Sequence, residues 1–561
     1  MGTRIAGTVL TARRLFSPRA KILRPRPIVS FCAGLISVAA YSSFPAESGI
    51  PPLFALALLA LALLYHALTC PLRPSGKSQG NRQAFLHGFF YGLGLFLGGV
   101  SWVYISLSRF AALPAPLAAL LTLLFAACLA LYPACAALCF YRLARARWHG
   151  RRLLAFFWRP FLFAALWMLF EKLRGTLGTG FPWLSAGYSQ LPGESPLSGY
   201  APLLGVYGVS FLVALSAAWG IDFPRLFFRA VRAEKKVRAR AFSLALLLIS
   251  LWGAGGALTR AHWTSAADAP VPAVLLQGNI AQELKWRPEH LWNTLLLYRS
   301  MIAAHPAALI ILPETAFPLF LEQTPPAFLE DMRALLKREG SDLLFGIPAR
   351  RARAARSADY QNSAVSLGKS PAQRYDKRHL VPFGEFIPPG FHWFLRLANI
   401  PLADFAPGAE DQPPLALAGT RVAVSICYED LFGEELRRTA GDAAILVNLS
   451  NTAWFGDSLA PSQHLSIARM RALETGRPML RAGNTGVTAL ITPQGTVAAR
   501  LPAFTRAALP VSAQGTRGLT PYVRYGDAPA LLIAFLCLLL PVVNAAGRKR
   551  RCNAVSPPVF L

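Results

Sequence analysis

The chain has 561 residues, of which 54% are hydrophobic and only 15% are charged. This composition excludes an ordinary soluble globular protein and indicates a membrane protein. The formal net charge is +29, but the basic residues lie between long apolar runs, without the aromatic interleaving of a nucleic-acid module. We therefore interpret them as topology signals and expect no nucleic-acid partner.

Eight apolar runs have the character of membrane spans. The first follows a basic segment without a convincing cleavage site, so we interpret it as a signal anchor. The third carries glycines at spacings that permit close helix contact. The expected spans lie at or within residues 28–40, 51–68, 84–107, 117–141, 153–170, 203–221, 241–258 and 529–543.

Basic residues fall in alternate connections between these spans. The basic segments are 1–27, 73–82, 142–152, 225–240 and 548–551, and the connections between them are poor in Lys and Arg. The positive-inside rule then predicts that both termini are cytoplasmic. The predicted organisation is a basic cytoplasmic N-terminus (1–27), a transmembrane domain of about seven helices (28–259), an extracytoplasmic domain (260–525), a final transmembrane helix (526–546) and a basic cytoplasmic tail (547–561).

The extracytoplasmic segment is long enough, at ~250 residues, for one globular domain. Strand-like runs alternate with helix-length periods, which predicts a layered α/β domain. The expected strands are 271–277, 308–312, 342–347, 363–367, 422–426 and 444–449, the expected helices are 288–304, 325–338 and 461–475, and a hairpin joins 486–492 to 497–501.

Cys427 follows a run of β-branched residues that predicts a short buried strand. A helix beginning just after it would offer free N–H groups, which favour a thiolate and can later bind an oxyanion. The other seven cysteines lie in or beside apolar runs, so Cys427 has no local partner. From this stretch alone, a reactive thiol and a buried apolar cysteine that closes a strand are equally compatible.

Two more strand ends carry reactive groups. Glu314 follows the apolar run I-I-L-P, and Lys377 precedes Glu385 by eight residues. A carboxylate can accept the thiol proton, and an ammonium can stabilise both a thiolate and an oxyanion. Each signal is weak alone. No metal-ligand spacing and no phosphate-binding glycine loop occurs in the sequence, so we expect neither a metal nor a cofactor.

The order Glu, Lys, Cys resembles the nitrilase or carbon–nitrogen hydrolase superfamily, whose α-β-β-α sandwich holds such a triad. The local strings resemble the apolipoprotein N-acyltransferase family within it, which inserts this domain between the seventh and eighth of eight spans. These strings are T-G-F-P-W-L-S-A-G-Y-S-Q (179–190), G-V-Y-G-V-S-F-L (205–212), L-Q-G-N-I (276–280), S-N-T-A-W-F-G-D-S (450–458), A-R-M-R-A-L-E-T-G-R-P (468–478) and N-T-G-V-T (484–488).

The resemblance implies a two-step acyl transfer. The thiolate of Cys427 attacks the sn-1 ester of a phospholipid such as phosphatidylethanolamine, and the resulting thioester acylates the α-amino group of an apolipoprotein's diacylglyceryl-cysteine. It also implies a multi-pass protein of the inner membrane, acting as a monomer with its catalytic domain on the periplasmic side.

The resemblance further assigns roles to individual positions. Glu314 is the base, Lys377 stabilises the oxyanion together with the Tyr428 N–H, and Glu385 orients the lysine. Tyr428 and Glu429 match further positions around the nucleophile, and Trp286 and Trp454 match aromatic positions linked with substrate. Thr452 departs from the Asp expected there, which leaves its loop contacts open.

Residues 383–405 carry a heavy apolar load for an exposed loop. Near a bilayer, Trp393 and Phe394 could lie at the interface and gate the entry of acyl chains. Packing against the domain core is the alternative.

Two other functions stay open at this point. A membrane-tethered amidase or nitrile hydrolase would use the same triad, with water resolving the intermediate. A transporter with a solute-binding outer domain is disfavoured, because ionisable residues are few in the middle of the spans.

Overall fold

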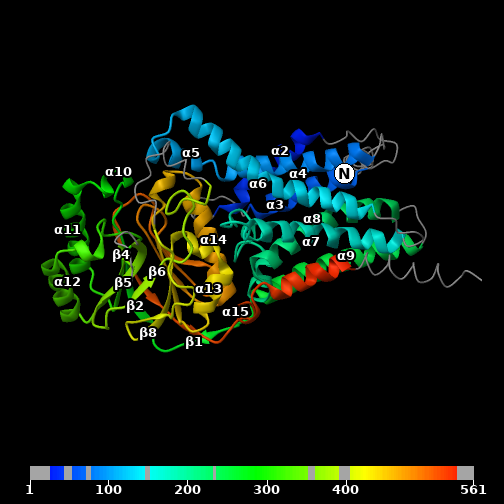
Figure 1. The fold of residues 1–561 in the computed structure, drawn as a ribbon. Coiled ribbons are helices and arrows are strands. Elements are labelled where there is room, and N and C mark those ends of the chain that lie inside the picture. The colour runs from blue at the N-terminus through cyan, green and yellow to red at the C-terminus, as the bar shows by residue number, and fades with distance from the viewer. Residues whose placement is uncertain are drawn as a thin grey trace, which may run out of the picture.

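The computed structural model describes residues 26–42, 53–70, 77–145, 152–230, 235–351, 360–390 and 405–539. Figure 1 shows two parts, a bundle of long helices and an α/β domain, with the last helix (red) returning to the bundle. The bundle helices are α2 (Pro27–Ser37), α3 (Phe54–Thr69), α4 (Lys77–Gly99), α5 (Val103–Ile105), α6 (Ala115–Ala144), α7 (Arg152–Arg174), α8 (Ala201–Ala230), α9 (Lys235–Leu258) and Ala528–Leu539.

Seven of the eight expected spans each overlap one of these helices, and the third, 84–107, overlaps both α4 and α5. Three helical stretches in the described ranges are long and apolar enough to cross a membrane, namely Ala115–Ala144, Pro196–Phe227 and Arg238–Leu258. A fourth is reached if α4 and the segment Val103–Phe110, bent by 57°, count as one span. The membrane character of the chain is therefore evident, while the number of eight spans stays a prediction.

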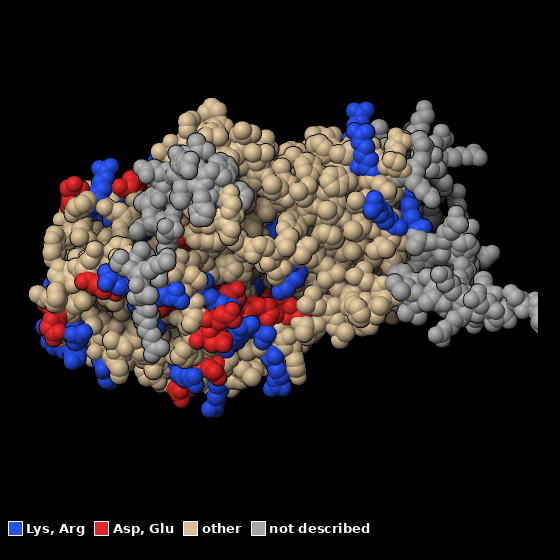
Figure 2. All heavy atoms as spheres, viewed as in Figure 1, with Lys and Arg blue, Asp and Glu red and all other residues tan. Residues whose placement is uncertain are grey.

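Charged side chains are distributed unequally between the two parts. Figure 2 shows Lys, Arg, Asp and Glu spread over the α/β domain, whereas the visible flank of the bundle is largely uncharged, with Lys and Arg toward its far end. An uncharged flank of this kind can face the hydrocarbon core of a membrane without placing charged side chains there.

Glycines let the helices of the bundle approach backbone to backbone. A Cβ on Gly94 of α4 would lie 2.1 Å from the carbonyl oxygen of Phe31 in α2, and one on Gly88 would lie 2.4 Å from that of Pro133 in α6. The glycine spacing of the third predicted span thus packs α4 between α2 and α6, as small residues do in membrane bundles.

The α/β domain contains two six-stranded sheets, in the orders β12-β11-β10-β9-β8-β7 and β13-β2-β3-β4-β5-β6. The strands of the first are β7 (Leu415–Leu417), β8 (Thr420–Ile426), β9 (Ile445–Ser450), β10 (Met479–Gly483), β11 (Ala489–Ile491) and β12 (Val497–Arg500). Those of the second are β2 (Val271–Gln277), β3 (Leu309–Ile311), β4 (Asp342–Arg350), β5 (Tyr360–Gly368), β6 (Arg374–Asp376) and β13 (Ala507–Ala513). A two-stranded ribbon pairs β1 (Ser265–Ala266) with β14 (Thr516–Arg517).

Apolar contacts show four layers. Residues of both sheets, such as Leu275, Ile311, Val424 and Val447, share one core between the sheets. A second core packs α11 (Pro288–Ala304) and α12 (Pro326–Arg338) on the sheet that contains β2. A third packs α13 (Gly433–Ala440) and α14 (Ala460–Thr475) on the other sheet. The architecture is the predicted α-β-β-α sandwich.

All six predicted strands and all three predicted helices of this domain are present, and β11 pairs with β12 as the predicted hairpin. No ranges were predicted for strands β1, β6, β7, β10, β13 and β14. Parallel pairing of β2 with β3 and of β8 with β9 brings the carboxyl ends of neighbouring strands to common edges, where the site forms.

Candidate active site

Glu314 lies just beyond β3, in a turn with unusual backbone geometry. The next residue, Thr315, has φ +49°, and Gly346 of β4 leaves room for the turn, since a Cβ there would lie 2.4 Å from the Thr315 nitrogen. A strained backbone held by its surroundings is common where a side chain must be aimed. The carboxylate of Glu314 is 7% exposed and directed inward.

Lys377, the residue after β6, is the buried cation of the site. Its Nζ donates to Glu314 at 3.2 Å and to Glu385 at 2.9 Å. Burial disfavours the charge, but the two carboxylates outweigh it and raise the pKa of Lys377, so the side chain is an ammonium. Glu385 is held in turn by the N–H of Val381 at 2.8 Å.

Asn362 of β5 links the two carboxylates. Its side-chain N–H donates to Glu314 at 2.8 Å and to Glu385 at 2.7 Å. The sequence analysis missed this residue, because an asparagine within a strand carries no signal until strand pairing places it opposite its partners.

Cys427 lies at a sharp turn with φ +52°, directly after β8. The expected helix does not begin there, because residues Cys427–Leu431 form a short 3₁₀ helix and the α-helix α13 starts at Gly433. Burial and the nearby Glu314 carboxylate raise the pKa of Cys427 to about 12. The resting side chain is therefore a thiol, although N–H groups at the turn were expected to favour a thiolate.

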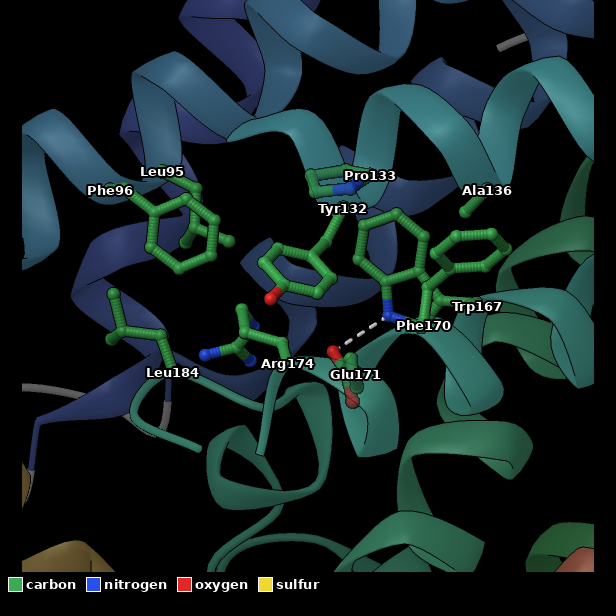
Figure 3. Close-up of a pocket in the computed structure, with 10 residues that line it drawn as sticks. All are labelled: Leu95, Phe96, Tyr132, Pro133, Ala136, Trp167, Phe170, Glu171, Arg174 and Leu184. Atoms are coloured by element: carbon green, nitrogen blue, oxygen red, sulfur yellow. Dashed lines mark hydrogen bonds between the residues drawn. The ribbon is translucent and has the colours of Figure 1, made fainter. Parts of the chain in front are cut away.

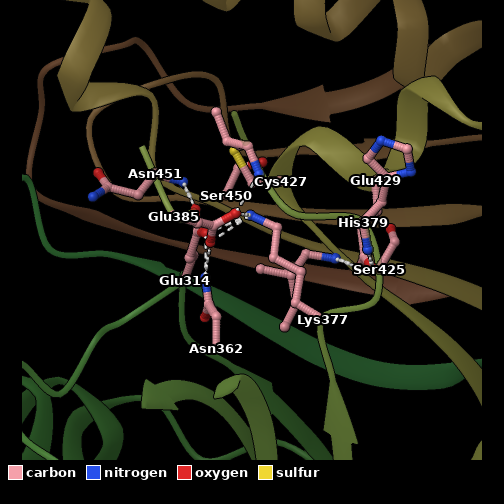
Figure 4. A network of polar contacts seen from close by, with 12 residues as sticks. Glu314, Asn362, Lys377, His379, Glu385, Ser425, Cys427, Glu429, Ser450 and Asn451 are labelled. Atoms are coloured by element: carbon pink, nitrogen blue, oxygen red, sulfur yellow. Dashed lines mark hydrogen bonds and ion pairs between the residues drawn. The ribbon is translucent and has the colours of Figure 1, made fainter. Parts of the chain in front are cut away.

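Glu314 is nevertheless ionised beside this thiol. Burial alone would raise its pKa, but Lys377, Lys285 and Asn362 hold the pKa of Glu314 below its usual value. Its second oxygen accepts the N–H of Asn451 at 2.9 Å. Figure 4 shows Glu314, Lys377, Glu385 and Cys427 converging at one place, so the structure gathers the predicted triad, whose catalytic roles stay a prediction.

Glu429 joins two separate segments of the site. Its carboxylate accepts the N–H of Ile426 at 2.7 Å and the N–H groups of Arg378 and His379 at 2.7 and 3.1 Å. The Tyr375 hydroxyl adds a bond of 3.0 Å. Burial raises the pKa of Glu429 to about 7, although the main-chain N–H donors favour its charged form.

Tyr428 connects the nucleophile turn to the helical bundle. Its hydroxyl donates to the carbonyl oxygen of Gly180 at 3.0 Å, and His379 contacts the carbonyl oxygen of Thr179 at 2.9 Å. The segment after α7 therefore rests against the turn that carries Cys427. In the sequence analysis, only the resemblance of residues 179–190 to the family had pointed to this segment.

The two aromatic positions assigned to substrate lie in the described part of the site. Trp286 follows α10 (Gln282–Lys285) and is half-buried. Trp454 packs edge-on against Phe110 at 5.2 Å between ring centroids, and its carbonyl oxygen accepts the Ser106 hydroxyl at 2.8 Å. Trp393 and Phe394, the predicted lipid gate, fall outside the described residues.

Thr452, the one departure from the expected motif, is 2% exposed. Its hydroxyl finds no hydrogen-bond partner among the described residues. It lies against Gly486, where a Cβ would come 2.2 Å from the threonine oxygen.

A buried polar network, which the sequence analysis missed, contacts the main chain of the nucleophile. Asn448 donates to the carbonyl oxygen of Cys427 at 3.2 Å and accepts from Arg481 at 2.8 Å. Arg481 also pairs with Asp430 at 3.3 Å, and Asp430 binds His464 at 2.7 Å. Buried networks of this kind help to fix the geometry of a site. Two atoms of this network, Arg481 Nε and His464 Nδ1, have no hydrogen-bond partner among the described residues.

A separate small pocket, with a cavity volume of about 20 Å³, lies in the bundle. Figure 3 shows Glu171 and Arg174 reaching into it among aromatic and apolar side chains. Arg174 donates to the carbonyl oxygens of Phe181 and Trp183, so it holds the segment that contacts Tyr428. The lining of the pocket contains no triad residue.

Comparison with known proteins decides the family. Residues 33–219 match the apolipoprotein N-acyltransferase N-terminal domain, and residues 273–515 match the carbon–nitrogen hydrolase family. The apolipoprotein N-acyltransferase of Nitrosomonas europaea is 44% identical over 94% of this chain and 99% of its own. This chain belongs to the apolipoprotein N-acyltransferase family. The resemblance inferred from the local strings is thereby confirmed.

A second relative agrees with this membership. The apolipoprotein N-acyltransferase of Ralstonia nicotianae is 46% identical over 83% of this chain and 85% of its own. Among solved structures, a carbon–nitrogen hydrolase from Helicobacter pylori is similar at 21% identity and a TM-score of 0.33, covering 44% of this chain and 89% of that chain. As a family member, the chain is a membrane-associated acyltransferase.

Proposed function

We propose that this N-acyltransferase moves a fatty acyl chain from a phospholipid, through a thioester on Cys427, to the α-amino group of a lipoprotein's diacylglyceryl-cysteine. Family membership supports lipoprotein acylation. The observation that carries the residue assignment is the buried cluster in which Lys377 lies 3.2 Å from Glu314 and 2.9 Å from Glu385, beside Cys427. Phosphatidylethanolamine is the proposed donor.

In the first half-reaction, Glu314 takes the thiol proton while the sulfur of Cys427 attacks the ester carbonyl carbon. The high pKa of the buried thiol means that this proton leaves only as the carbon–sulfur bond forms. Lys377 and the Tyr428 N–H stabilise the oxyanion. The C–O bond then breaks, Glu314 returns the proton to the leaving alkoxide, and a lysophospholipid departs.

In the second half-reaction, the neutral α-amine of the lipoprotein attacks the thioester carbonyl carbon. Glu314 accepts the amine proton and returns it to the sulfur as the C–S bond breaks. Glu385 and Asn362 hold the side chains of Lys377 and Glu314 in fixed positions through both steps. Trp286 and Trp454 contact the substrate, and Trp393 and Phe394 gate the entry of the acyl chain.

The proposed topology follows from charge and hydropathy. Eight spans hold the protein in the inner membrane as a monomer, with both termini in the cytoplasm and residues 260–525 in the periplasm. The uncharged flank of the bundle in Figure 2 and the contact of Tyr428 with Gly180 support a site next to the outer membrane face of the bundle.

The proposal is tested by incubating the purified full chain with phosphatidylethanolamine labelled in its sn-1 chain and a synthetic diacylglyceryl lipopeptide. Mass spectrometry should show one labelled acyl chain on the lipopeptide and an equal amount of lysophospholipid. A lipopeptide with an acetylated N-terminus is the matched control and should stay unchanged. Release of free labelled fatty acid instead would favour the hydrolase.

A further inference from the structure

Lys285 is a second buried lysine at the site. It is the last residue of α10 and is 2% exposed. Its Nζ donates to the main-chain carbonyl oxygen of Glu314 at 3.2 Å, and among the described residues no carboxylate forms an ion pair with it. The structure thus places an ammonium on the backbone of the proposed base, rather than on its carboxylate.

The short helix that carries Lys285 is tied to the same turn. The side-chain oxygen of Gln282 accepts from the Asn451 side chain at 2.8 Å. The main-chain N–H of Asn451 donates to the second oxygen of Glu314 at 2.9 Å. Hydrogen bonds therefore connect helix α10, the Asn451 loop and the Glu314 turn. The bond from Lys285 to the Glu314 carbonyl oxygen links the helix directly back to that turn.

The ammonium of Lys285 attracts the negative charge of both reacting groups, with its hydrogen bond made to Glu314. Lys377 is already shared by Glu314 and Glu385, whereas Lys285 is free of such pairing among the described residues. Burial lowers the pKa of Lys285 to about 8, and attraction to Glu314 and Cys427 works against that decrease. The other charged groups that face Cys427 are Glu314, Lys377 and Arg481.

We propose that Lys285 is a positioning residue of the acyl-transfer site, which fixes the turn of Glu314 and stabilises the negative charge on Cys427 as its proton leaves. In this role it acts through Glu314 and through its charge, without forming a bond to substrate. The proposal deepens the function proposed above and rests on it for the reaction, although its effect on the thiol can be measured without any lipid.

Alkylation of Cys427 by iodoacetamide in the full chain isolates that effect. The alkylated peptide is quantified by mass spectrometry, because other cysteines also react. Lys285→Gln keeps a hydrogen-bond donor but removes the charge, and Lys285→Arg keeps the charge. Lys369→Gln removes a charge from an exposed lysine and is the matched control.

The thiolate fraction limits alkylation below the pKa of the thiol. Lys285→Gln should therefore slow alkylation about tenfold at a fixed pH, as expected for a shift of about one pKa unit. Lys285→Arg and Lys369→Gln should keep the wild-type rate. Acyl-enzyme formation with phosphatidylethanolamine should fall by about 10- to 100-fold in Lys285→Gln and recover in Lys285→Arg.

Equal alkylation and equal acylation in Lys285→Gln and wild type would overturn the proposal. So would slowing by the Arg and Gln substitutions alike, or a Gln variant whose melting transition is lost, because either result assigns Lys285 to the fold. If wild type alkylates at Cys427 yet forms no acyl-enzyme, the proposed function fails, and the alkylation comparison still judges the charge effect.

Discussion

The carboxylate of Glu429 accepts the main-chain N–H of Arg378 at 2.7 Å. Its other oxygen accepts the N–H of Ile426, also at 2.7 Å, next to the nucleophile. One buried side chain thus fixes the loop that follows Lys377 relative to the turn that carries Cys427. A shift of this loop would move the cation away from the sulfur.

Glu429→Gln should break this connection. The amide NH₂ cannot accept a hydrogen bond, so at least one N–H is left without an acceptor, at a cost of about 1–3 kcal/mol. We expect acyl-enzyme formation to fall by about 10- to 100-fold, with a lower melting temperature. Rapid-quench mass spectrometry and thermal unfolding in detergent measure both. The exposed carboxylate of Glu410 is the control, since Glu410→Gln should change neither quantity.

The same carboxylate predicts a pH dependence. Burial raises the pKa of Glu429 to about 7, so the charged acceptor is lost as the pH falls through that value. Acyl-enzyme formation should therefore decline from pH 8 to pH 6, and the inflection should be absent in Glu429→Gln. An inflection of equal size in that variant would assign the pH dependence to another group.

Lys377→Met should abolish acyl-enzyme formation and lower the melting temperature. It leaves Glu314 and Glu385 buried without their shared cation, which costs about 3–5 kcal/mol in comparable buried pairs. Adding Glu385→Gln removes one of the stranded charges, so the double variant should regain part of the melting temperature while staying inactive. A double variant no more stable than Lys377→Met would contradict this account of the cluster.

The buried thiol of Cys427 predicts a steep alkylation profile. Because its pKa is raised to about 12, the thiolate fraction should rise steeply from pH 7 to pH 10, by less than tenfold per pH unit where Lys285 loses its charge near pH 8 and by about tenfold above that range. Iodoacetamide labelling of the Cys427 peptide measures this rise. A plateau near pH 8 would instead indicate the preformed thiolate that the strand-to-helix turn suggested.

Much of the fold could be predicted from the sequence, because apolar residues recur with characteristic spacings in strands and in amphipathic helices. The strand before Cys427 and the helix 288–304 are examples, and the structure has them as β8 and α11. The triad positions could be proposed because Glu314 and Cys427 each follow an apolar strand and the order Glu, Lys, Cys matches a family. The membrane spans were predicted from hydropathy. Their number stays a prediction, because only three or four of the described helices are long and apolar enough to cross a membrane.

The residues that orient the triad could not be found in this way. Asn362 lies inside a strand and becomes informative only when β5 pairs with β4 and β6. Lys285 occurs in the polar string Q-E-L-K, where a lysine ordinarily faces solvent, and only the position of α10 turns it inward. The pKa of Cys427 could not be predicted from the sequence either, because burial by elements distant in the chain raises it.

The measurement that tests the central claim most directly is the intact mass of the purified chain after incubation with phosphatidylethanolamine, before and after hydroxylamine. We expect one acyl chain on the Cys427 peptide, labile to hydroxylamine, discharged by a diacylglyceryl lipopeptide but not by water, and absent in Cys427→Ala and Cys427→Ser. An adduct that persists in Cys427→Ala, or the absence of any adduct in wild type, would contradict the account.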